Sequence, residues 1–360
     1  MGRVLLWVVG VLLALGSVGV VLLRVPAVQD RVVEAAVDRM VRASADELFA
    51  EDALRVLLCG TSSPMPHPDR AKPCTAVFAA GRFWVVDTGI GSWNRLALWR
   101  IPGDRIGAVF LTHFHSDHIG ALGEYDLQTW VAGREVPLRV YGPMGVERVV
   151  AGFEQAYAMD ARYRTAHHGA DLMAPALGRM LARPFAPPRP GAAPVVILEE
   201  DGLRVTAFAV DHRPVAPAVG YRFDYRGRSV VVSGDTVKHA DLIEAARGAD
   251  VLVHEAQADH LVAVVGRAAG GAGRARVAKI MSDIPDYHTP PVAAAEAANK
   301  AEVGLLVLTH LTPPPPNRLV EQVFVRGVAE VRPDGWILAD DGLLVELPAQ
   351  SADLVVRSLD

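Results

Sequence analysis

Residues 112–118 read Thr112-His113-Phe114-His115-Ser116-Asp117-His118 and place three histidines and one aspartate within six positions. The apolar run Ala108-Val109-Phe110-Leu111 comes directly before them and predicts a short buried strand. Ile119-Gly120-Ala121-Leu122 follows and predicts the opening of an amphipathic helix. The cluster is therefore expected on a strand-to-helix turn, where several side chains can converge on one point.

The residue types in this turn are those that bind metal ions. Imidazole and carboxylate groups are ligands that zinc prefers. His113 and His115 are two positions apart in extended chain, so they face the same side and can share one ion. Asp117 and His118 are turned by the start of the helix and would face a second ion. The alternative is a polar loop whose histidines only form hydrogen bonds, and so dense a cluster of ligands argues against it.

The composition describes a chain that can bury a large core. It has 360 residues, of which 51% are hydrophobic and 21% charged, so one large domain or two are expected. The formal net charge of −5 provides no electrostatic case for binding nucleic acid. The two cysteines, Cys59 and Cys74, could form a disulfide in an oxidising compartment or stay free, and they do not indicate a metal site.

The N-terminal segment has the composition of a membrane helix. Residues 5–23 are apolar, glycine or serine throughout and stand between Arg3 and Arg24. A span of ~20 such residues matches the hydrocarbon thickness of a bilayer. Residues 1–26 are therefore predicted to be an uncleaved membrane anchor, with the periplasmic or extracellular side favoured for the rest of the chain. A signal peptide cleaved near Val25-Pro26-Ala27 is the alternative.

Residues 27–53 are predicted to connect this segment to the main domain. Apolar residues recur at Val32, Val33, Val37 and Met40 with charged residues between them, which is the period of a helix. We therefore expect a linking helix here, followed by one α/β domain over residues 54–360.

From residue 54 onward, short apolar runs rich in β-branched residues repeatedly end in polar clusters. Residues 205–210 lead into Asp211-His212, residues 230–232 into Ser233-Gly234-Asp235-Thr236, and residues 305–308 into Thr309-His310. Strands buried on both faces have this pattern, and helical stretches such as residues 292–300 lie between several of them. The pattern predicts an α/β domain with its site along one edge of the sheets.

Three further ligand candidates stand at the ends of these strands: His212, Asp235 and His310. Each one alone would more often be structural, because Ser-Gly-Asp-Thr is also an ordinary turn and a single histidine after a strand usually forms a hydrogen bond. All three occupy the same position in the strand pattern as the His113 cluster. Together they complete seven ligands, which suffice for two ions that share one carboxylate.

This ligand series resembles that of the metallo-β-lactamase superfamily. The likeness covers about residues 54–347, and within the superfamily the chain is most similar to the ribonuclease Z and arylsulfatase-like branch. The segments that carry it are Gly60-Thr61-Ser62-Ser63-Pro64, Asp87-Thr88-Gly89, Val219-Gly220-Tyr221-Arg222, Ser233-Gly234-Asp235-Thr236, His254-Glu255-Ala256, His288-Thr289 and Thr309-His310. The resemblance implies a four-layer αβ/βα sandwich.

The resemblance also implies how the metal ions are shared. One zinc would be held by His113, His115 and His212, the other by Asp117, His118 and His310, with Asp235 bridging the two. Manganese or iron can replace zinc in such sites. Two cations roughly 3.5–4 Å apart can share a water and lower its pKa to around 7, and the hydroxide so formed attacks the ester.

Three residues are predicted to act in catalysis. Asp117 is positioned to orient the nucleophile or to take its proton. A leaving alkoxide needs a proton donor, and His288 matches the family's donor, with the Glu255 carboxylate keeping its imidazole protonated and oriented. A helix-capping loop for His288 and an ordinary salt bridge for Glu255 are the structural alternatives. Asp87 is predicted to orient a ligand histidine, with a simple turn as its alternative.

The predicted substrate is a small phosphodiester, sulfate ester or related ester. The ribonuclease Z enzymes carry a basic arm between the third metal motif and the Ser-Gly-Asp-Thr turn, whereas here residues 221–228 cross that gap in a tight hairpin. The Gly-rich stretch 266–276 is predicted to be a short flexible loop, too small to replace the arm. Together with the acidic net charge and the membrane segment, these features make nucleic acid an unfavoured partner.

Several other functions stay open at this point. They are a ribonuclease Z-type phosphodiesterase acting on RNA, a β-lactamase or lactonase, a single-iron sulfur dioxygenase-type oxidoreductase, and a catalytically inactive binding protein. A complete set of seven ligands argues against the last two, because one iron needs only part of the set and a binding protein needs none of it.

Overall fold

The computed structural model describes residue 7, residues 24–50 and residues 52–359. The chain divides into two compact units, Met1–Ala45 and Asp46–Asp360. The predicted membrane anchor over residues 1–26 lies outside the described residues, except for Trp7 and residues 24–26. Within the described part of the chain, no helix combines the length and the apolar character that a membrane span requires.

The linking segment contains helix α2 (Pro26–Arg42), at the position where the periodicity predicts a helix. Pro26 occupies the first helical position, where its missing N–H costs no hydrogen bond. None of the residues of α2 is buried, and Val33 and Met40 on its apolar stripe are both more than half exposed. A short 3-10 helix, η1 (Asp46–Phe49), begins the second unit.

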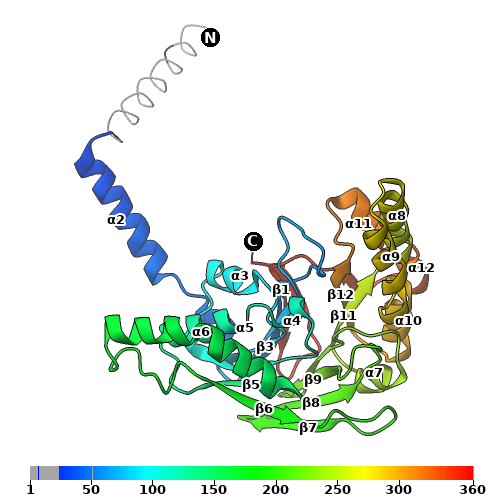
Figure 1. Ribbon diagram of the computed structural model, residues 1–360, viewed down its shortest axis with the longest axis horizontal. Helices are drawn as coiled ribbons and strands as arrows, with labels where there is room; N and C mark the ends of the chain where they lie inside the picture. The colour runs from blue at the N-terminus through cyan, green and yellow to red at the C-terminus, as the bar shows by residue number, and fades with distance from the viewer. Residues whose placement is uncertain (1–6, 8–23, 51, 360) are drawn as a thin grey trace. The chain divides into compact units, whose positions relative to one another are not determined.

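Two mixed β-sheets form the body of the second unit (Figure 1). The first has the strand order β15-β14-β1-β2-β3-β4-β5-β6, and the second has the order β13-β12-β11-β10-β9-β8-β7. The strands of the first sheet are β1 (Ala53–Gly60), β2 (Cys74–Ala79), β3 (Arg82–Val86), β4 (Ile106–Phe110), β5 (Leu138–Pro143), β6 (Met180–Phe185), β14 (Leu343–Pro348) and β15 (Val355–Ser358). Those of the second are β7 (Val195–Glu200), β8 (Leu203–Ala209), β9 (Val219–Tyr225), β10 (Arg228–Val232), β11 (Val251–Gln257), β12 (Leu305–Thr312) and β13 (Trp336–Leu338).

Helices cover the outer face of each sheet, so the predicted four-layer order is present. Against the first sheet, α3 (Ser92–Leu98) packs on β1 and α6 (Val146–His168) packs on β5 and β6. Against the second, α7 (Ala240–Ala245) packs on β8, and α10 (Pro291–Lys300) packs on β11 and β12. The remaining helices in the described residues are η2 (Gly103–Arg105), α4 (Ser116–Ile119), α5 (Leu122–Val131), α8 (Asp259–Gly271), α9 (Ala275–Asp283), η3 (Ile284–Tyr287), α11 (Arg318–Phe324) and α12 (Val328–Val331).

The main core lies between the two sheets. Phe110 of β4 is fully buried there and meets Phe223 of β9 edge to face, with ring centroids 5.5 Å apart. Each such aromatic side chain contributes roughly 1.5–3 kcal/mol by leaving water. Because β4 and β9 belong to different sheets, this packing holds together the two halves that carry the metal-ligand candidates.

The Gly-rich stretch 266–276 is not a flexible loop, so that prediction was wrong. Residues 266–271 end helix α8, residues 272–274 form a short turn, and residues 275–276 begin helix α9, which packs closely against α8. A Cβ added to Gly266 would lie 3.1 Å from Cβ of Met281 on the facing helix. The glycine therefore permits a close approach of two helices, which its residue type alone does not distinguish from flexibility.

The tight hairpin predicted over residues 221–228 is present. Strands β9 and β10 pair with Tyr225 opposite Arg228, so that Arg226 and Gly227 form a two-residue turn. Both turn residues have positive φ, 50° and 80°, as the hairpin turn that matches the strand twist requires. No arm extends from this position.

Cys59 at the end of β1 and Cys74 at the start of β2 form a disulfide. The sequence left this pairing open. The strands are antiparallel neighbours, and Cys74 pairs with Gly60 in the register, which brings the two Cα atoms to 4.9 Å from each other. Antiparallel pairing therefore supplies the proximity that the linear sequence cannot show.

Candidate metal centre

All seven predicted ligands gather where strands of both sheets end. The first four follow β4 in the turn before and through α4, the helix that carries Asp117 and His118. His212 follows β8, Asp235 follows β10 and His310 lies near the end of β12. Residues from the two halves of the chain thus face each other across one edge of the sandwich, as the strand pattern predicts.

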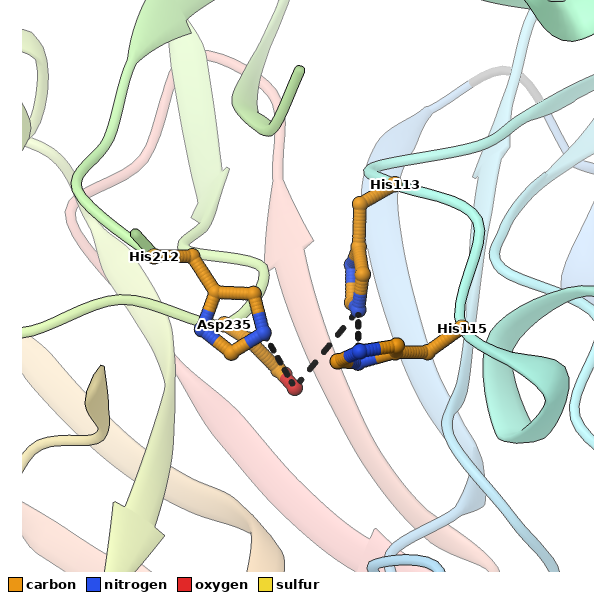
Figure 2. A group of neighbouring side chains, drawn as sticks. All are labelled: His113, His115, His212 and Asp235. Atoms are coloured by element: carbon orange, nitrogen blue, oxygen red, sulfur yellow. Dashed lines mark hydrogen bonds and ion pairs between the residues drawn. The ribbon is translucent and has the colours of Figure 1, made fainter. Parts of the chain in front are cut away.

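The first cluster contains His113, His115, His212 and Asp235, whose ligand atoms lie within 4.8 Å of one another. Figure 2 shows the three imidazoles and the carboxylate converging on one point, with His113 and His115 on one side and His212 and Asp235 on the other. Nε2 of His113 lies 3.0 Å from Nδ1 of His115 and 3.8 Å from Oδ2 of Asp235. Nε2 of His212 also lies 3.8 Å from that oxygen.

The second cluster contains Asp117, His118 and His310. Nε2 of His118 and Nε2 of His310 each lie 3.4 Å from Oδ2 of Asp235. Nε2 of His310 is also 3.4 Å from Oδ2 of Asp117. One carboxylate oxygen of Asp235 therefore neighbours ligand nitrogens of both clusters, which is the position of a bridging ligand.

These distances fit a shared cation better than direct hydrogen bonds. Contacts of 3.4–3.8 Å are mostly longer than a good N–H···O bond. Two ligand atoms on a tetrahedral zinc, each about 2.0–2.1 Å from the ion, are about 3.3–3.4 Å apart. The spacing between the nitrogens and the carboxylate oxygens is therefore close to that of ligands around an ion.

Unsatisfied polar atoms give a second indication of metal binding. Among the described residues, Oδ2 of Asp117 and Nε2 of His118, His212 and His310 are buried without a hydrogen-bond partner. A buried polar group without a partner costs roughly 1–3 kcal/mol, and buried polar groups are normally satisfied. Their convergence indicates that these atoms bind something that is not part of the chain, and imidazole with carboxylate suits a divalent cation.

The protonation of the cluster follows from burial and its carboxylates. Burial lowers the pKa of the His113 imidazole well below its usual value, and His118 lowers it further, so His113 offers a free lone pair. Burial also opposes the charge on His118, but Asp235, Asp87 and Asp117 outweigh this effect and raise its pKa well above the usual value. For Asp235, burial is outweighed by His310 and His118, and its pKa lies well below the usual value. The carboxylates thus attract positive charge to this point.

Asp87 contacts the ligand His118 on the side away from Asp235, as expected for a residue that orients a ligand histidine. It is buried, and its carboxylate accepts hydrogen bonds from the Thr112 backbone N–H at 2.8 Å and from Thr112 Oγ1 at 2.8 Å. It also lies 2.7 Å from Nδ1 of His118. A carboxylate accepts only, so the proton of neutral His118 is on Nδ1 and Nε2 is left as the ligand atom.

Two orienting contacts were not predicted. Nδ1 of His212 lies 2.9 Å from the backbone carbonyl oxygen of Tyr287, which directs Nε2 toward Asp235. Thr112 Oγ1 lies 3.1 Å from Nδ1 of His113. The position of Thr112 directly before the first ligand is a sequence signal for its contact. The contact with the Tyr287 carbonyl cannot be predicted in this way, because every residue has a backbone carbonyl.

His288 and Glu255 form the predicted pair at the side of the cluster. Nδ1 of His288 lies 3.0 Å from Oε1 of Glu255, and both side chains are buried. Burial alone would lower the pKa of His288, but the Glu255 carboxylate outweighs it and raises the pKa to about 9. A ring nitrogen of His288 also lies within 4.8 Å of ligand atoms of Asp235 and His310. Glu255 therefore favours the protonated form of an imidazole that lies adjacent to the centre.

His310 reaches the site through an irregularity in β12. Leu306 and Leu308 of this strand face the helices, so strict alternation would turn His310 toward the same side. The register shifts there: Glu255 and Gln257 of β11 pair with Thr309 and Thr312. His310 has φ of 48°, a left-handed conformation that is uncommon outside glycine. The bulge thus redirects the side chain into the centre.

The other histidines lie apart from the clusters that could hold an ion. These clusters, within the described residues, do not include His67, His167, His168, His239, His254 or His260. Residues 157–168, which include His167 and His168, are the second half of α6, where most side chains are at least partly exposed.

Comparison with known proteins agrees with the fold and the site. Residues 82–311 match the family of the β-lactamase superfamily domain. Ribonuclease Z of Mycobacterium avium (strain 104) is 39% identical over 263 residues, which cover 72% of this chain and 86% of that protein. Ribonuclease Z of Mycobacterium sp. (strain KMS) is 39% identical over 265 residues, with 72% and 85% covered.

Solved structures support the same fold. The metallo-β-lactamase fold protein YhfI from Bacillus subtilis has a TM-score of 0.58 and 19% identity, covering 82% of this chain and 100% of its own. The short form of human tRNase Z has a TM-score of 0.56 and 20% identity, covering 82% and 99%. The family match, the shared fold and the converging ligands lead to one conclusion. The chain belongs to the metallo-β-lactamase superfamily, is a metal-dependent hydrolase, and has ribonucleases Z among its relatives.

Proposed function

We propose that this protein is a dinuclear-metal phosphodiesterase whose substrate is RNA. The observation that carries the proposal is the position of Asp235, whose Oδ2 lies 3.4–3.8 Å from ligand nitrogens of both histidine clusters. Ribonuclease Z relatives at 39% identity support phosphodiester hydrolysis, and their name supports RNA as the substrate class.

Each ligand has a role in this proposal. One cation would be held by His113, His115 and His212, the second by Asp117, His118 and His310, with Asp235 shared. Zinc suits this set of donors, and manganese or iron are the alternatives. Two bound cations would supply Lewis-acid activation of water and would neutralise charge on the phosphoryl oxygens.

The chain's own groups would manage the protons. The Asp117 carboxylate lies 3.4 Å from Nε2 of His310 and would orient the attacking water or accept its proton. Protonated His288, held at Nδ1 by Glu255, would give a proton to the departing oxygen of the substrate. An alkoxide leaving group requires such a donor because its conjugate acid is weak.

The sequence alone ranked small esters above RNA, and the relatives reverse that order. Small phosphodiesters or sulfate esters remain a second candidate because of two observations. The two-residue turn between β9 and β10 leaves no arm to grip RNA. The disulfide between Cys59 and Cys74 suits an oxidising compartment, where RNA processing is not expected.

The membrane anchor is also a proposal, supported by the apolar composition of residues 5–23. It predicts that the full-length protein stays in the membrane fraction after an alkaline carbonate wash. Release into the supernatant by the wash would contradict it.

A substrate panel tests the proposed function. The purified full-length protein, supplied with zinc or manganese, is assayed on a precursor transfer RNA, on bis-p-nitrophenyl phosphate and on p-nitrophenyl sulfate. We expect hydrolysis of the RNA and of the diester, and loss of both activities in Asp117→Asn. His168→Ala, an exposed histidine of α6, is the matched control and should retain full activity.

The outcomes separate the two candidates. Cleavage of the diester or the sulfate without cleavage of the RNA would favour the small-ester candidate. Activity that survives chelation or Asp117→Asn would contradict a metal-dependent hydrolase at this site.

A further inference from the structure

A pocket lies next to the metal centre, beside His212. It has a volume of about 410 Å³, within the range typical of small-molecule sites. Its walls come mainly from two loops, residues 186–194 between β6 and β7 and residues 210–218 between β8 and β9, and His239 before α7 completes them. His212, a member of the first cluster, is part of the wall, so the pocket borders the metal centre.

The walls of this pocket are mainly proline and small apolar residues. Pro187, Pro188 and Pro190 contribute one side, and Pro217 and Ala218 contribute to the other. Proline rings have few conformations and carry no N–H, so they form a rigid apolar surface without unsatisfied donors. Such a surface excludes water from a flat group and loses little conformational entropy when that group binds.

The charged groups at the pocket neutralise one another. The guanidinium of Arg213 donates to both carboxylate oxygens of Asp211, at 2.9 Å from Nε and 2.6 Å from Nη2. His239 is engaged with Asp241, whose backbone N–H donates to its Nδ1 at 3.3 Å. Neither contact leaves an unpaired charge to attract a phosphate. The pocket therefore suits a neutral, apolar part of a substrate rather than the phosphate itself.

We propose that this pocket binds the aromatic base next to the scissile phosphate of a nucleotide substrate. The inference rests on the proposed phosphodiesterase activity and adds to it a specificity site. The phosphate at the metal centre would place one ester substituent beside His212, and the planar base is the nucleotide component that is uncharged and has flat apolar faces. Ala216 and Pro217 would then help to determine which substituents are accepted.

Binding measurements test this without depending on turnover. Adenosine 5′-monophosphate and ribose 5-phosphate share the phosphate and the sugar and differ in the base. Isothermal titration calorimetry on the full-length protein should give at least about 10-fold tighter binding of the adenosine nucleotide, because only this ligand can bury the faces of a base against the proline walls. Equal affinities would overturn the proposal.

A substitution that fills the pocket provides the second test. Ala216 lines the pocket and is exposed, so Ala216→Trp should fold and occupy part of the space. It should abolish the preference for the adenosine nucleotide and leave ribose 5-phosphate binding unchanged. Ala193→Trp on the opposite loop is the matched control, since Ala193 is exposed but does not line the pocket. The proposal is wrong if both variants still bind the adenosine nucleotide more tightly than ribose 5-phosphate. It is also wrong if Ala216→Trp weakens the binding of both ligands equally while its melting temperature matches that of the control.

Activity separates this inference from the proposed function. The adenosine p-nitrophenyl phosphodiester and methyl p-nitrophenyl phosphate have the same leaving group, and only the first carries a base. Hydrolysis of both with equal KM would overturn the base pocket and leave the phosphodiesterase intact. Hydrolysis of neither, together with tighter binding of adenosine 5′-monophosphate, would overturn the phosphodiesterase and leave a nucleotide pocket.

Discussion

Replacing Asp87 with asparagine should weaken one metal site and spare the other. Asp87 is buried and accepts two hydrogen bonds from Thr112 while it faces Nδ1 of His118. Its φ of 60° lies in the left-handed region, which asparagine tolerates better than most residues. Asp87→Asn therefore keeps the shape and the backbone and changes only the hydrogen-bonding pattern.

The expected loss of metal affinity follows from the changed hydrogen bonds of residue 87. The amide oxygen can still accept from the Thr112 N–H, and the amide NH₂ can donate to Thr112 Oγ1, whose hydroxyl can rotate. The same NH₂ then faces Nδ1 of His118 and favours the tautomer with its proton on Nε2, the atom that lies 3.4 Å from Asp235. Loss of such an orienting partner typically costs 10–100-fold in metal affinity, or about 1.4–2.7 kcal/mol.

Zinc binding measured by competition with a chromogenic chelator tests this reasoning on the full-length protein. The wild-type protein should bind two ions, and Asp87→Asn should weaken one of them by about 10–100-fold. The ion held by His113, His115 and His212 should keep its affinity. Asp171→Asn, at an exposed position after α6, is the control and should change neither ion. Equal weakening of both ions, or of neither, would refute the argument.

Three further predictions address the catalytic pair, the disulfide and the metal. His288→Ala should reduce turnover of an alkyl phosphodiester by about 10²–10⁴-fold. It should affect a p-nitrophenyl diester far less, because p-nitrophenolate needs no proton to leave. Equal losses in the steady-state rates of the two substrates would exclude His288 as the proton donor. Reducing the Cys59–Cys74 disulfide, which closes a separation of 15 residues, should cost about 3 kcal/mol of unfolding free energy in urea titrations; the double variant Cys59→Ala/Cys74→Ala should show no response to the reductant. Removing the metal with a chelator should lower the melting temperature. Zinc at 1,000 times its dissociation constant should then raise the free energy of unfolding by about 4 kcal/mol. A melting temperature that does not respond to zinc would argue against zinc binding by the folded state.

The strands that carry the ligands could be predicted because they are buried on both faces. Residues 230–232 of β10 are three valines, of which Val230 and Val232 face the core between the sheets and Val231 faces the helices, and such continuous β-branched runs have few other interpretations. Edge strands carry no such signal. Most residues of β6, Met180–Phe185, are at least partly exposed, and no alternation marks it as a strand. Helix α6 has only Val146 and Val150 buried, so its sequence shows little helical periodicity.

In the metal centre, the identity of the ligands could be predicted from the sequence, but the orientation of their side chains could not. His310 was predicted as a ligand from its place after a strand, yet it reaches the centre through a bulge and a positive φ that strand alternation does not indicate. The contact between His212 and the Tyr287 carbonyl joins residues 75 positions apart and depends on the packing of two loops. The proline-walled pocket likewise depends on two loops that meet only in the folded chain.

The two-residue turn at Arg226 and Gly227 has a consequence for how substrate range can change. The turn is exposed, and insertions at such positions are tolerated because the paired strands on either side keep their register. A segment grafted there would leave Asp235 and the other ligands where they are. Recognition of a large substrate could therefore be added to or deleted from this scaffold as a module, which makes the turn the natural place to insert a substrate-binding segment.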